Sequence, residues 1–267
     1  MRILIKAIAL FLLLILYALV ALCIMALPAK RARKLERLTG NVMFFARLGI
    51  RLLGIRVHSR RLKRKDIRQR RTRTHYLIIA NHLTYADVLV VASLMPSVFI
   101  TSVELKQTFP LGFFAWLGGC LFVERRSRAG LKKEIEEIEA VLALGTSVTL
   151  FPEGTTSNGD TVRPFKNSLI TAAITTGTDL LPVCIRYRAA NGRLVDLSNR
   201  DSIYYYGGTT FFQHLPRFLA LKSLDVECVI LKPIAAHQHL SRKDLATQAH
   251  QMISAAYHEQ TKTHGKM

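Results

Sequence analysis

Cysteine and acidic residues are both scarce in this chain of 267 residues. Its 4 cysteines lie far apart without C-x-x-C spacing, which argues against a disulfide scaffold and a zinc site and fits a reducing compartment. Only 18 residues are Asp or Glu, against 38 Lys and Arg, so the formal net charge is +20. Such a charge predicts an anionic partner: a nucleic acid, an acidic lipid surface or a phosphorylated substrate.

No internal repeat, low-complexity tract or Pro/Gly-rich linker divides the sequence. Its length fits one domain, or one domain with an anchor. A hydrophobic content of 50% excludes an intrinsically disordered chain. A G-x-S-x-G motif is also absent, which argues against a serine hydrolase or a thioesterase.

Charge is missing from residues 7–29, a run of 23 residues dominated by Leu, Ile, Ala and Val. A helix of this length spans about 34 Å, enough for a bilayer core of about 30 Å. Five basic side chains follow between Lys30 and Arg37, whereas only Arg2, Lys6 and the α-amine precede the run. The pattern favours a retained membrane anchor in residues 1–29 over a cleaved signal peptide. It also predicts that the rest of the chain lies on the cytoplasmic side of a bacterial-type inner membrane.

Residues 30–75 form a basic juxtamembrane segment with two parts. In residues 42–55, apolar residues alternate with arginines, which fits an interfacial helix and a core helix equally well. Between Arg56 and Arg73 nearly every second residue is basic. Because this run lacks interleaved aromatic residues and a nucleic-acid-binding motif, it favours anionic membrane lipids as partner and no nucleic acid. A solvated charged loop is the alternative.

From residue 76 onward, short apolar runs alternate with helical patterns. The runs that predict buried strands are residues 76–80, 98–101, 120–123, 147–151, 180–187 and 226–231. The clearest helix covers residues 129–144 and stops at Gly145, and a last helix begins after an N-cap at Ser241. We therefore predict an α/β domain in residues 76–267, with a single, mostly parallel central sheet covered by helices. An N-terminal transmembrane or membrane-embedded helix would precede it.

The first of four polar clusters runs from Asn81 to Asp87, directly after a predicted strand. It contains His82, and a histidine in such a turn can act as a general base near neutral pH. The two side chains meet only if His82 lies in the turn and Asp87 in the first helical residues. Asp87 would then hold one imidazole nitrogen and leave the other for a substrate hydroxyl, as in a serine-hydrolase triad with an alcohol in place of the serine. Alone, this spacing is a weak signal.

The second and fourth clusters are less specific. The segment Gly119 to Arg125 ends in a guanidinium suited to phosphate or carboxylate, but alone a surface arginine is the simpler interpretation. The segment Leu181 to Val183 places Pro182 in an apolar strand, and strand geometry alone accounts for a proline at a strand start or edge.

The third cluster is Phe151-Pro152-Glu153-Gly154-Thr155, again at a strand end. Proline removes a donor and glycine permits close approach, so the segment predicts a shaped loop in which Glu153 is exposed and accepts from a polyol hydroxyl. Further on, Lys166 lies just before a helix that we expect to start near Asn167. An ammonium at a helix N-terminus predicts an anion site.

In this order and spacing, the four clusters resemble those of the glycerophospholipid acyltransferase family, which includes 1-acylglycerol-3-phosphate acyltransferase. The resemblance covers residues 76–187, and the H-x-x-x-x-D and F-P-E-G-T blocks are its most specific part. It implies that His82 deprotonates the acceptor hydroxyl and that Asp87 orients the imidazole. The hydroxyl would attack an acyl thioester of coenzyme A or acyl carrier protein. No metal, cofactor or covalent acyl-enzyme is expected.

The same resemblance implies roles for the remaining residues. Those expected to bind the acceptor headgroup are Arg125, Glu153, Gly154 and Thr155, with assistance from Lys166. Those expected to shape the site are Asn81, Gly119, Phe122, Phe151, Pro152 and Pro182.

The acceptor is expected to be a lysolipid, and the resemblance favours 1-acyl-sn-glycerol-3-phosphate, which would give phosphatidic acid. Family members acting on that lipid often have Arg after F-P-E-G-T and Gly two places after F-K, whereas this chain has Thr156 and Ser168. The F-P-E-G-T-T-S form is similar to the branch that acylates lyso-ornithine lipid, a phosphorus-free aminolipid. That lipid or another lysolipid is therefore the alternative. A non-catalytic, membrane-anchored polybasic binding protein is the alternative of another class, but it leaves both main blocks unexplained.

Overall fold

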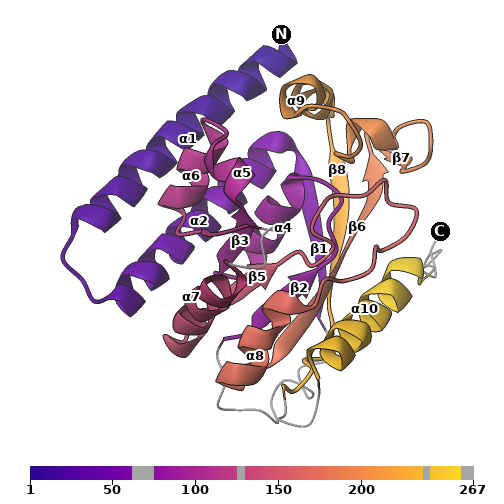
Figure 1. Ribbon diagram of the computed structural model, residues 1–267. Coiled ribbons are helices and arrows are strands. Elements are labelled where there is room, and N and C mark those ends of the chain that lie inside the picture. The colour runs from indigo at the N-terminus through magenta and orange to yellow at the C-terminus, as the bar shows by residue number, and fades with distance from the viewer. Residues whose placement is uncertain (62–74, 125–129, 237–240, 260–267) are drawn as a thin grey trace.

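The computed structural model describes residues 1–61, 75–124, 130–236 and 241–259 (Figure 1). Within them, the core is an eight-stranded sheet in the order β1-β8-β6-β2-β5-β3-β4, with β7 paired to β6. The strands are β1 (Ile55–Arg61), β2 (Leu77–Ala80), β3 (Val98–Ser102), β4 (Leu121–Val123), β5 (Val148–Leu150), β6 (Leu180–Ala190), β7 (Arg193–Leu194) and β8 (Leu224–Ile230).

Five neighbouring strands, β6, β2, β5, β3 and β4, run parallel to one another. Strand β8 is antiparallel to β6, and β1 is parallel to β8. The mostly parallel sheet predicted from the sequence is thereby confirmed. Because the parallel strands share one direction, the carboxyl ends of β2, β5, β3 and β4 all lie at the same edge of the sheet.

Helices cover both faces of this sheet. They are α4 (Ala86–Leu94), α5 (Val103–Lys106), α6 (Leu111–Leu117), α7 (Leu131–Ala143), α8 (Thr171–Thr176), α9 (Phe211–Ala220) and α10 (Arg242–His258), with 3-10 turns at Ser168–Ile170 and Arg200–Ser202. Alternate residues of β2 enter two separate cores. Ile78 packs with Val90 of α4 and Phe218 of α9, whereas Leu77 packs with Ile138 of α7 and with helix α10.

The two helices that the sequence predicts most clearly are present. Helix α7 ends just before Gly145, whose φ of 78° permits the left-handed turn. Helix α10 starts with a capping box, in which the Ser241 hydroxyl accepts from the Asp244 backbone N–H and the Asp244 side chain accepts from the N–H of Ser241.

Two long helices, α1 (Arg2–Ala26) and α2 (Arg31–Leu53), form an antiparallel pair at one side of the domain (Figure 1). Helix α1 is long and apolar enough, by length and composition, to cross a membrane. One of its faces nevertheless packs on the domain from Ala7 to Ala21. Near its start, the Lys6 Nζ donates to the backbone oxygens of Leu53 and Leu221, at 2.8 and 2.6 Å. The opposite face is an exposed apolar stripe that includes Leu4, Ile8, Phe11, Leu12, Ile15, Leu16, Leu19 and Leu22.

Helix α2 decides between the two interpretations left open for residues 42–55. Phe45, Ala46 and Leu53 are buried, and α2 packs along α4 and α1. Most of this stretch is therefore a core helix, although Phe44 is exposed. The reason is that the apolar residues recur every three to four positions, which places them on one helical face.

Strand β1 lies in the segment that the sequence predicts to be juxtamembrane, and we did not expect it. It adds the edge next to β8, and two of its arginines pair with carboxylates: Arg56 with Asp225 at 2.7 Å, and Arg60 with Glu259 at 2.5 Å. These guanidinium groups therefore have protein partners, whereas the interpretation from sequence assigned them to a membrane surface or a solvated loop. The rest of the basic run, residues 62–74, lies outside the described residues.

Candidate active site

The turn after β2 brings His82 and Asp87 together as the sequence predicts. His82 lies in the turn and Asp87 in the first turn of α4, and the His82 Nδ1 is 2.8 Å from the Asp87 Oδ2. The carboxylate is fully buried, whereas the imidazole is partly exposed. Because Asp87 holds Nδ1, the other ring nitrogen, Nε2, remains for a substrate hydroxyl.

Both oxygens of Asp87 have further hydrogen-bond donors. Oδ2 also accepts from the backbone N–H groups of Leu83 and Thr84, at 2.6 and 2.9 Å. Oδ1 accepts from the hydroxyl of Tyr187 on β6, at 2.7 Å. Burial raises the pKa of Tyr187 well above its usual value, and the adjacent Asp87 adds to this effect. The phenol therefore stays protonated and donates to the carboxylate. Tyr187 is a further residue of the site, and no local sequence pattern predicted it.

Glu153 also holds His82 in place, although its own side chain is buried. Its Oε1 accepts from the backbone N–H of His82 at 2.6 Å, and its Oε2 accepts from that of Arg163 at 3.0 Å. The expectation that Glu153 is exposed is wrong, since the residue is only 5% exposed. The reason is that buried backbone N–H groups at the end of a strand need an acceptor. Burial raises the pKa of the Glu153 carboxyl to about 7, although the two N–H donors oppose the shift.

Asn81 and Phe151, predicted to shape the site, lie directly beside the dyad. The Asn81 side chain exchanges two hydrogen bonds with the backbone of Ile185 on β6, at 2.9 and 2.8 Å. The Phe151 ring stacks on the His82 ring, with 4.2 Å between centroids. The first contact ties the end of β2 to β6, and the second restricts the tilt of the imidazole.

Lys166 lies over the turn that contains Gly154. Its backbone N–H donates to the oxygen of Pro152 at 2.9 Å, and a Cβ added to Gly154 would be 3.0 Å from the Lys166 Nζ. Gly154 also has a φ of 73°, so a side chain there would be strained as well as crowded. Thr155 is exposed next to it. The helix expected near Asn167 is a 3-10 turn followed by the six-residue α8, so its dipole is small and adds little to the charge of the Lys166 ammonium.

The other predicted site residues lie near strands β4 and β6. Pro182 is buried in β6 opposite Ile79, at the end of the pairing with β8, where its backbone oxygen accepts from the N–H of Leu231 at 3.0 Å and no proline N–H is available to return the bond. Phe122 on β4 has the Lys106 Nζ 5.6 Å from its ring centroid. Gly119 forms the turn before β4 with a φ of 75°.

Arg125 lies outside the described residues. The backbone next to it is nevertheless held, because the N–H of Glu124 donates to a carboxylate oxygen of Glu134 on α7. Glu134 is not among the site residues predicted from the sequence.

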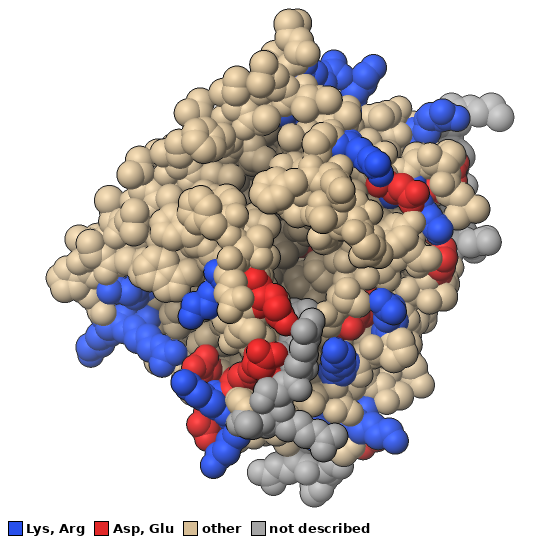
Figure 2. All heavy atoms as spheres, turned by 45° about the horizontal axis from the view of Figure 1, so that its top comes forward, with Lys and Arg blue, Asp and Glu red and all other residues tan. Residues whose placement is uncertain are grey.

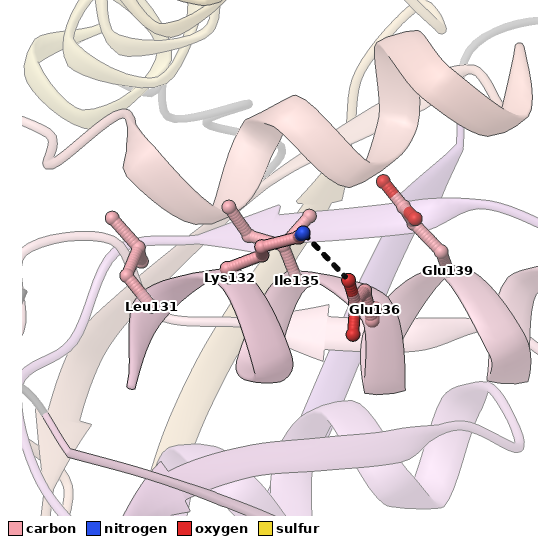
Figure 3. A pocket seen from close by; sticks show the side chains of 5 residues that line it. All are labelled: Leu131, Lys132, Ile135, Glu136 and Glu139. Atoms are coloured by element: carbon pink, nitrogen blue, oxygen red, sulfur yellow. Dashed lines mark ion pairs between the residues drawn. The ribbon is translucent and has the colours of Figure 1, made fainter. Parts of the chain in front are cut away.

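The carboxyl ends of the parallel strands lie toward the top of Figure 1, and Figure 2 turns this side forward and shows a hollow near its middle. A different depression, a groove of about 410 Å³, follows α7 and is lined by Leu131, Lys132, Ile135, Glu136 and Glu139 (Figure 3). Its lining residues come from one helix and include none of the predicted site residues. It contains an ion pair between Lys132 and Glu136, at 3.9 Å. The groove is therefore no part of the candidate active site.

Chemically, the site presents a histidine whose orientation is set by a buried, fully hydrogen-bonded carboxylate. A histidine held in this way can take a proton from a bound hydroxyl and return it to a leaving group. In the described ranges, no group of three or more His, Cys, Asp and Glu side chains is placed to hold a metal ion.

Comparison with known proteins agrees with this geometry. A sequence model described as Acyltransferase matches residues 54–186. The lyso-ornithine lipid O-acyltransferase of Pseudomonas aeruginosa is 30% identical over 185 residues, 67% of each chain, and that of Brucella abortus is 28% identical over 219 residues, 79% of each chain. The 1-acyl-sn-glycerol-3-phosphate acyltransferase of Neisseria meningitidis is 33% identical over 117 residues, 44% of this chain and 46% of that one.

Among solved structures, the 1-acyl-sn-glycerophosphate acyltransferase of Thermotoga maritima has a similar fold. The TM-score is 0.64 at 19% identity, and the match covers 98% of this chain and 100% of the other.

Proposed function

This chain belongs to the acyltransferase family, and on that premise we propose that it transfers a fatty acyl group from an acyl thioester to the free hydroxyl of lyso-ornithine lipid at a membrane surface. The proposed reaction type rests on the hydrogen bond between the His82 Nδ1 and the buried Asp87, which leaves Nε2 free of that carboxylate. The donor would be acyl-coenzyme A or acyl carrier protein.

The proposed reaction needs one base that later acts as an acid. The His82 Nε2 takes the proton of the acceptor hydroxyl while the hydroxyl oxygen attacks the thioester carbonyl. This attack forms the C–O bond of the ester and gives a tetrahedral intermediate. The intermediate collapses with re-formation of the C=O bond and cleavage of the C–S bond, and the thiolate takes the proton from His82. Asp87 stabilises the imidazolium between these steps. Glu153 holds the backbone of His82 in place through the hydrogen bond described above.

Two observations support lyso-ornithine lipid as acceptor. The relatives with that name match 67% and 79% of their length, whereas the 1-acyl-sn-glycerol-3-phosphate acyltransferase matches 46% of its own. In addition, this chain has Thr156 after F-P-E-G-T, so a cation is missing where a phosphate-binding relative often has Arg. The second candidate is 1-acyl-sn-glycerol-3-phosphate, which is favoured by the higher identity of 33% and by the Lys166 ammonium beside Gly154.

The contacts of α1 support a membrane location in which this helix stays attached to the domain. Because one face of α1 packs on the domain and Lys6 binds carbonyls at the ends of α2 and α9, we infer that the helix lies along the domain rather than crossing a bilayer. Its exposed apolar stripe would instead be buried in one leaflet. The basic residues that follow α1 would contact anionic headgroups, and because such lipids give the cytoplasmic leaflet its negative charge, we place the protein on the cytoplasmic side of the inner membrane.

A reconstituted assay tests the proposed function. Full-length protein in liposomes would receive a labelled acyl thioester of each carrier, together with lyso-ornithine lipid, 1-acyl-sn-glycerol-3-phosphate or another lysolipid. We expect diacyl product mainly from lyso-ornithine lipid and none from His82→Ala. The matched control is His58→Ala, because His58 is also next to an aspartate, 3.2 Å from Asp225, but lies on β1.

Each other outcome of this assay changes the conclusion. Product mainly from 1-acyl-sn-glycerol-3-phosphate would select the second candidate. Full activity in His82→Ala would overturn the assignment of the base. No transfer from either donor to any lysolipid would favour the polybasic binding protein.

A second experiment tests the acceptor alone. Thr156→Arg would place a cation in the F-P-E-G-T turn, and Thr156→Gln is the matched neutral control. We expect the preference for 1-acyl-sn-glycerol-3-phosphate over lyso-ornithine lipid to rise about tenfold in the Arg variant, because a charge-assisted hydrogen bond to phosphate contributes roughly 1.5–3 kcal/mol before screening. An unchanged ratio of kcat/KM would show that residue 156 does not face the headgroup.

A further inference from the structure

Three aromatic side chains project from α6 and the turn before it. Phe109, Phe113 and Trp116 are 81%, 39% and 46% exposed. Phe113 and Trp116 are three residues apart, which places them on the same side of α6, and Phe109 lies in the turn before the helix begins at Leu111. The rings of Phe113 and Trp116 stack on each other, with 6.2 Å between centroids.

The helix that carries these rings is firmly held. On its other side, Leu117 is fully buried and the backbone oxygen of Phe114 accepts from the hydroxyl of Tyr17 on α1, at 3.1 Å. A Cβ on Gly118 would be 2.9 Å from that same hydroxyl. The exposure of the three rings is thus a consequence of how α6 is docked on α1, rather than of a loose helix.

The aromatic side chains extend the apolar stripe of α1. Helices α1 and α6 are in contact, and Figure 2 shows a wide surface without Lys, Arg, Asp or Glu over the side of the molecule where both lie. This surface borders the hollow at the carboxyl edge of the sheet (Figure 2). A contiguous exposed apolar surface of this kind indicates an interaction site.

Its chemistry fits a lipid bilayer. Aromatic side chains, tryptophan above all, favour the level where acyl chains meet headgroups. Exposed basic residues follow at the end of α1, including Lys30, Arg31 and Arg33, and these suit anionic lipids. We propose that Phe109, Phe113 and Trp116 insert into the membrane interface as a second contact beside α1. This inference rests on the proposed membrane location, and it assigns that contact to residues between β3 and β4.

The position of α6 explains what such a contact would do. The helix lies between β3 and β4, and the carboxyl ends of these two strands lie at the same edge of the sheet as the turn that carries His82. With α1 alone inserted, the domain could still rotate about the axis of that helix. A second insertion point removes this rotation and holds the edge of the sheet against the headgroups, where a lysolipid hydroxyl is found.

Trp116 supplies the test, because it is the single tryptophan of the chain. Full-length protein would be reconstituted in vesicles of phosphatidylcholine and phosphatidylglycerol, and flotation would establish that it is bound. Trp116 fluorescence would then be quenched either by lipids brominated near the headgroup or by acrylamide in the water. We expect strong quenching by the brominated lipids, a blue-shifted emission and at least threefold weaker quenching by acrylamide than for the free indole in water.

A pair of double variants provides the control. Phe109→Ser/Phe113→Ser retains Trp116 but removes the neighbouring rings, so we expect lipid quenching to fall about threefold. Leu194→Ser/Leu197→Ser removes two side chains that are each 76% exposed, near β7, and should leave the quenching of Trp116 unchanged.

The fluorescence result is independent of catalysis. Full quenching by acrylamide in vesicle-bound protein, with no effect of the brominated lipids, would overturn the inference even if acyl transfer is normal. Lipid quenching in a protein that transfers no acyl group would support the inference while the proposed reaction fails.

Discussion

The turn after β2 and the outer face of α1 differ in the kind of contact that gives each its function. In the turn, the Asp87 carboxylate accepts directed hydrogen bonds from backbone N–H groups and from Tyr187, and the backbone N–H of His82 donates to Glu153. On α1, the exposed side chains offer apolar area. The strength of a hydrogen bond depends on the position of single atoms, whereas the free energy gained by burying apolar area is a sum over many side chains. Single substitutions should therefore have large effects in the turn and small effects on α1.

The largest effect is expected for Asp87→Asn. The amide group cannot accept hydrogen bonds at both positions, so the imidazole loses the partner that sets its tautomer and stabilises its charge. We expect kcat to fall roughly a thousandfold. The measurement is steady-state turnover in detergent micelles, with a thermal melt to establish that the variant is folded. Asp225→Asn, which removes the carboxylate next to His58, is the matched control and should retain wild-type kcat.

Tyr187→Phe should have the next largest effect. It leaves the Oδ1 of the buried Asp87 without its hydroxyl donor, which costs about 1–3 kcal/mol, and we expect kcat to fall about tenfold with KM unchanged. Because a stability loss alone could also lower activity, the decisive measurement is a double-mutant cycle. In the Asp87→Asn background, Tyr187→Phe should add little to the loss of kcat.

Tyr204→Phe is the control for this prediction, since Tyr204 is also buried and its ring lies 5.8 Å from that of Tyr187. An equal loss of kcat in both tyrosine variants would contradict the special role of Tyr187. So would a fully additive double variant.

The sequence predicted those parts of the molecule that leave a local pattern. The spacing of His82 and Asp87 requires the histidine in a turn and the aspartate at a helix start, and the structure has this arrangement. The apolar runs marked the strands of the parallel sheet, and Ser241 marked the start of α10. In each case the residues that determine the feature lie within a few positions of one another.

The features that the sequence did not reveal depend on contacts between distant residues. Tyr187 lies 100 positions from Asp87, and Glu153 lies 71 positions from the N–H group that it binds. Strand β1 pairs with β8, which lies near the opposite end of the chain. Its arginines make this segment resemble a charged surface run, since the carboxylates that pair with them lie far away in the sequence, on β8 and after α10. The residues next to these positions in the sequence do not indicate such partners.

The hydrogen bonds of Glu153 in the turn can be tested through the pH dependence of the protein's stability. Its pKa is about 7 in the folded protein, above the value of roughly 4.3 for an unfolded chain. Between these values the folded state binds more protons, so this residue stabilises the fold at low pH and the contribution is lost as the pH rises through 7. Glu153→Gln does not titrate.

We therefore expect Glu153→Gln to melt several degrees below the wild type at pH 5, because its amide cannot accept both backbone N–H bonds, and this deficit to narrow toward pH 8. Thermal melts of both proteins from pH 5 to 8 check the prediction. The pKa of Asp225 is lowered by the hydrogen bond from Arg56. Its titration changes the melting temperature of both proteins equally, so it does not affect the difference between them. A deficit that is constant with pH would show that the raised pKa has no effect on stability.

The smallest effect is expected on α1. Leu12 belongs to the exposed stripe, and Leu12→Ser removes one side chain from an apolar surface that many residues share. Because α1 would remain attached through its packed face, the apparent KM for a lysolipid in vesicles should rise only about twofold and kcat should not change. The same variant assayed with a short-chain, water-soluble lysolipid should match the wild type in both constants. A loss of kcat with that soluble acceptor would mean that α1 affects the geometry of the His82–Asp87 dyad. The proposed difference between hydrogen bonds in the turn and shared apolar area on α1 would then be wrong.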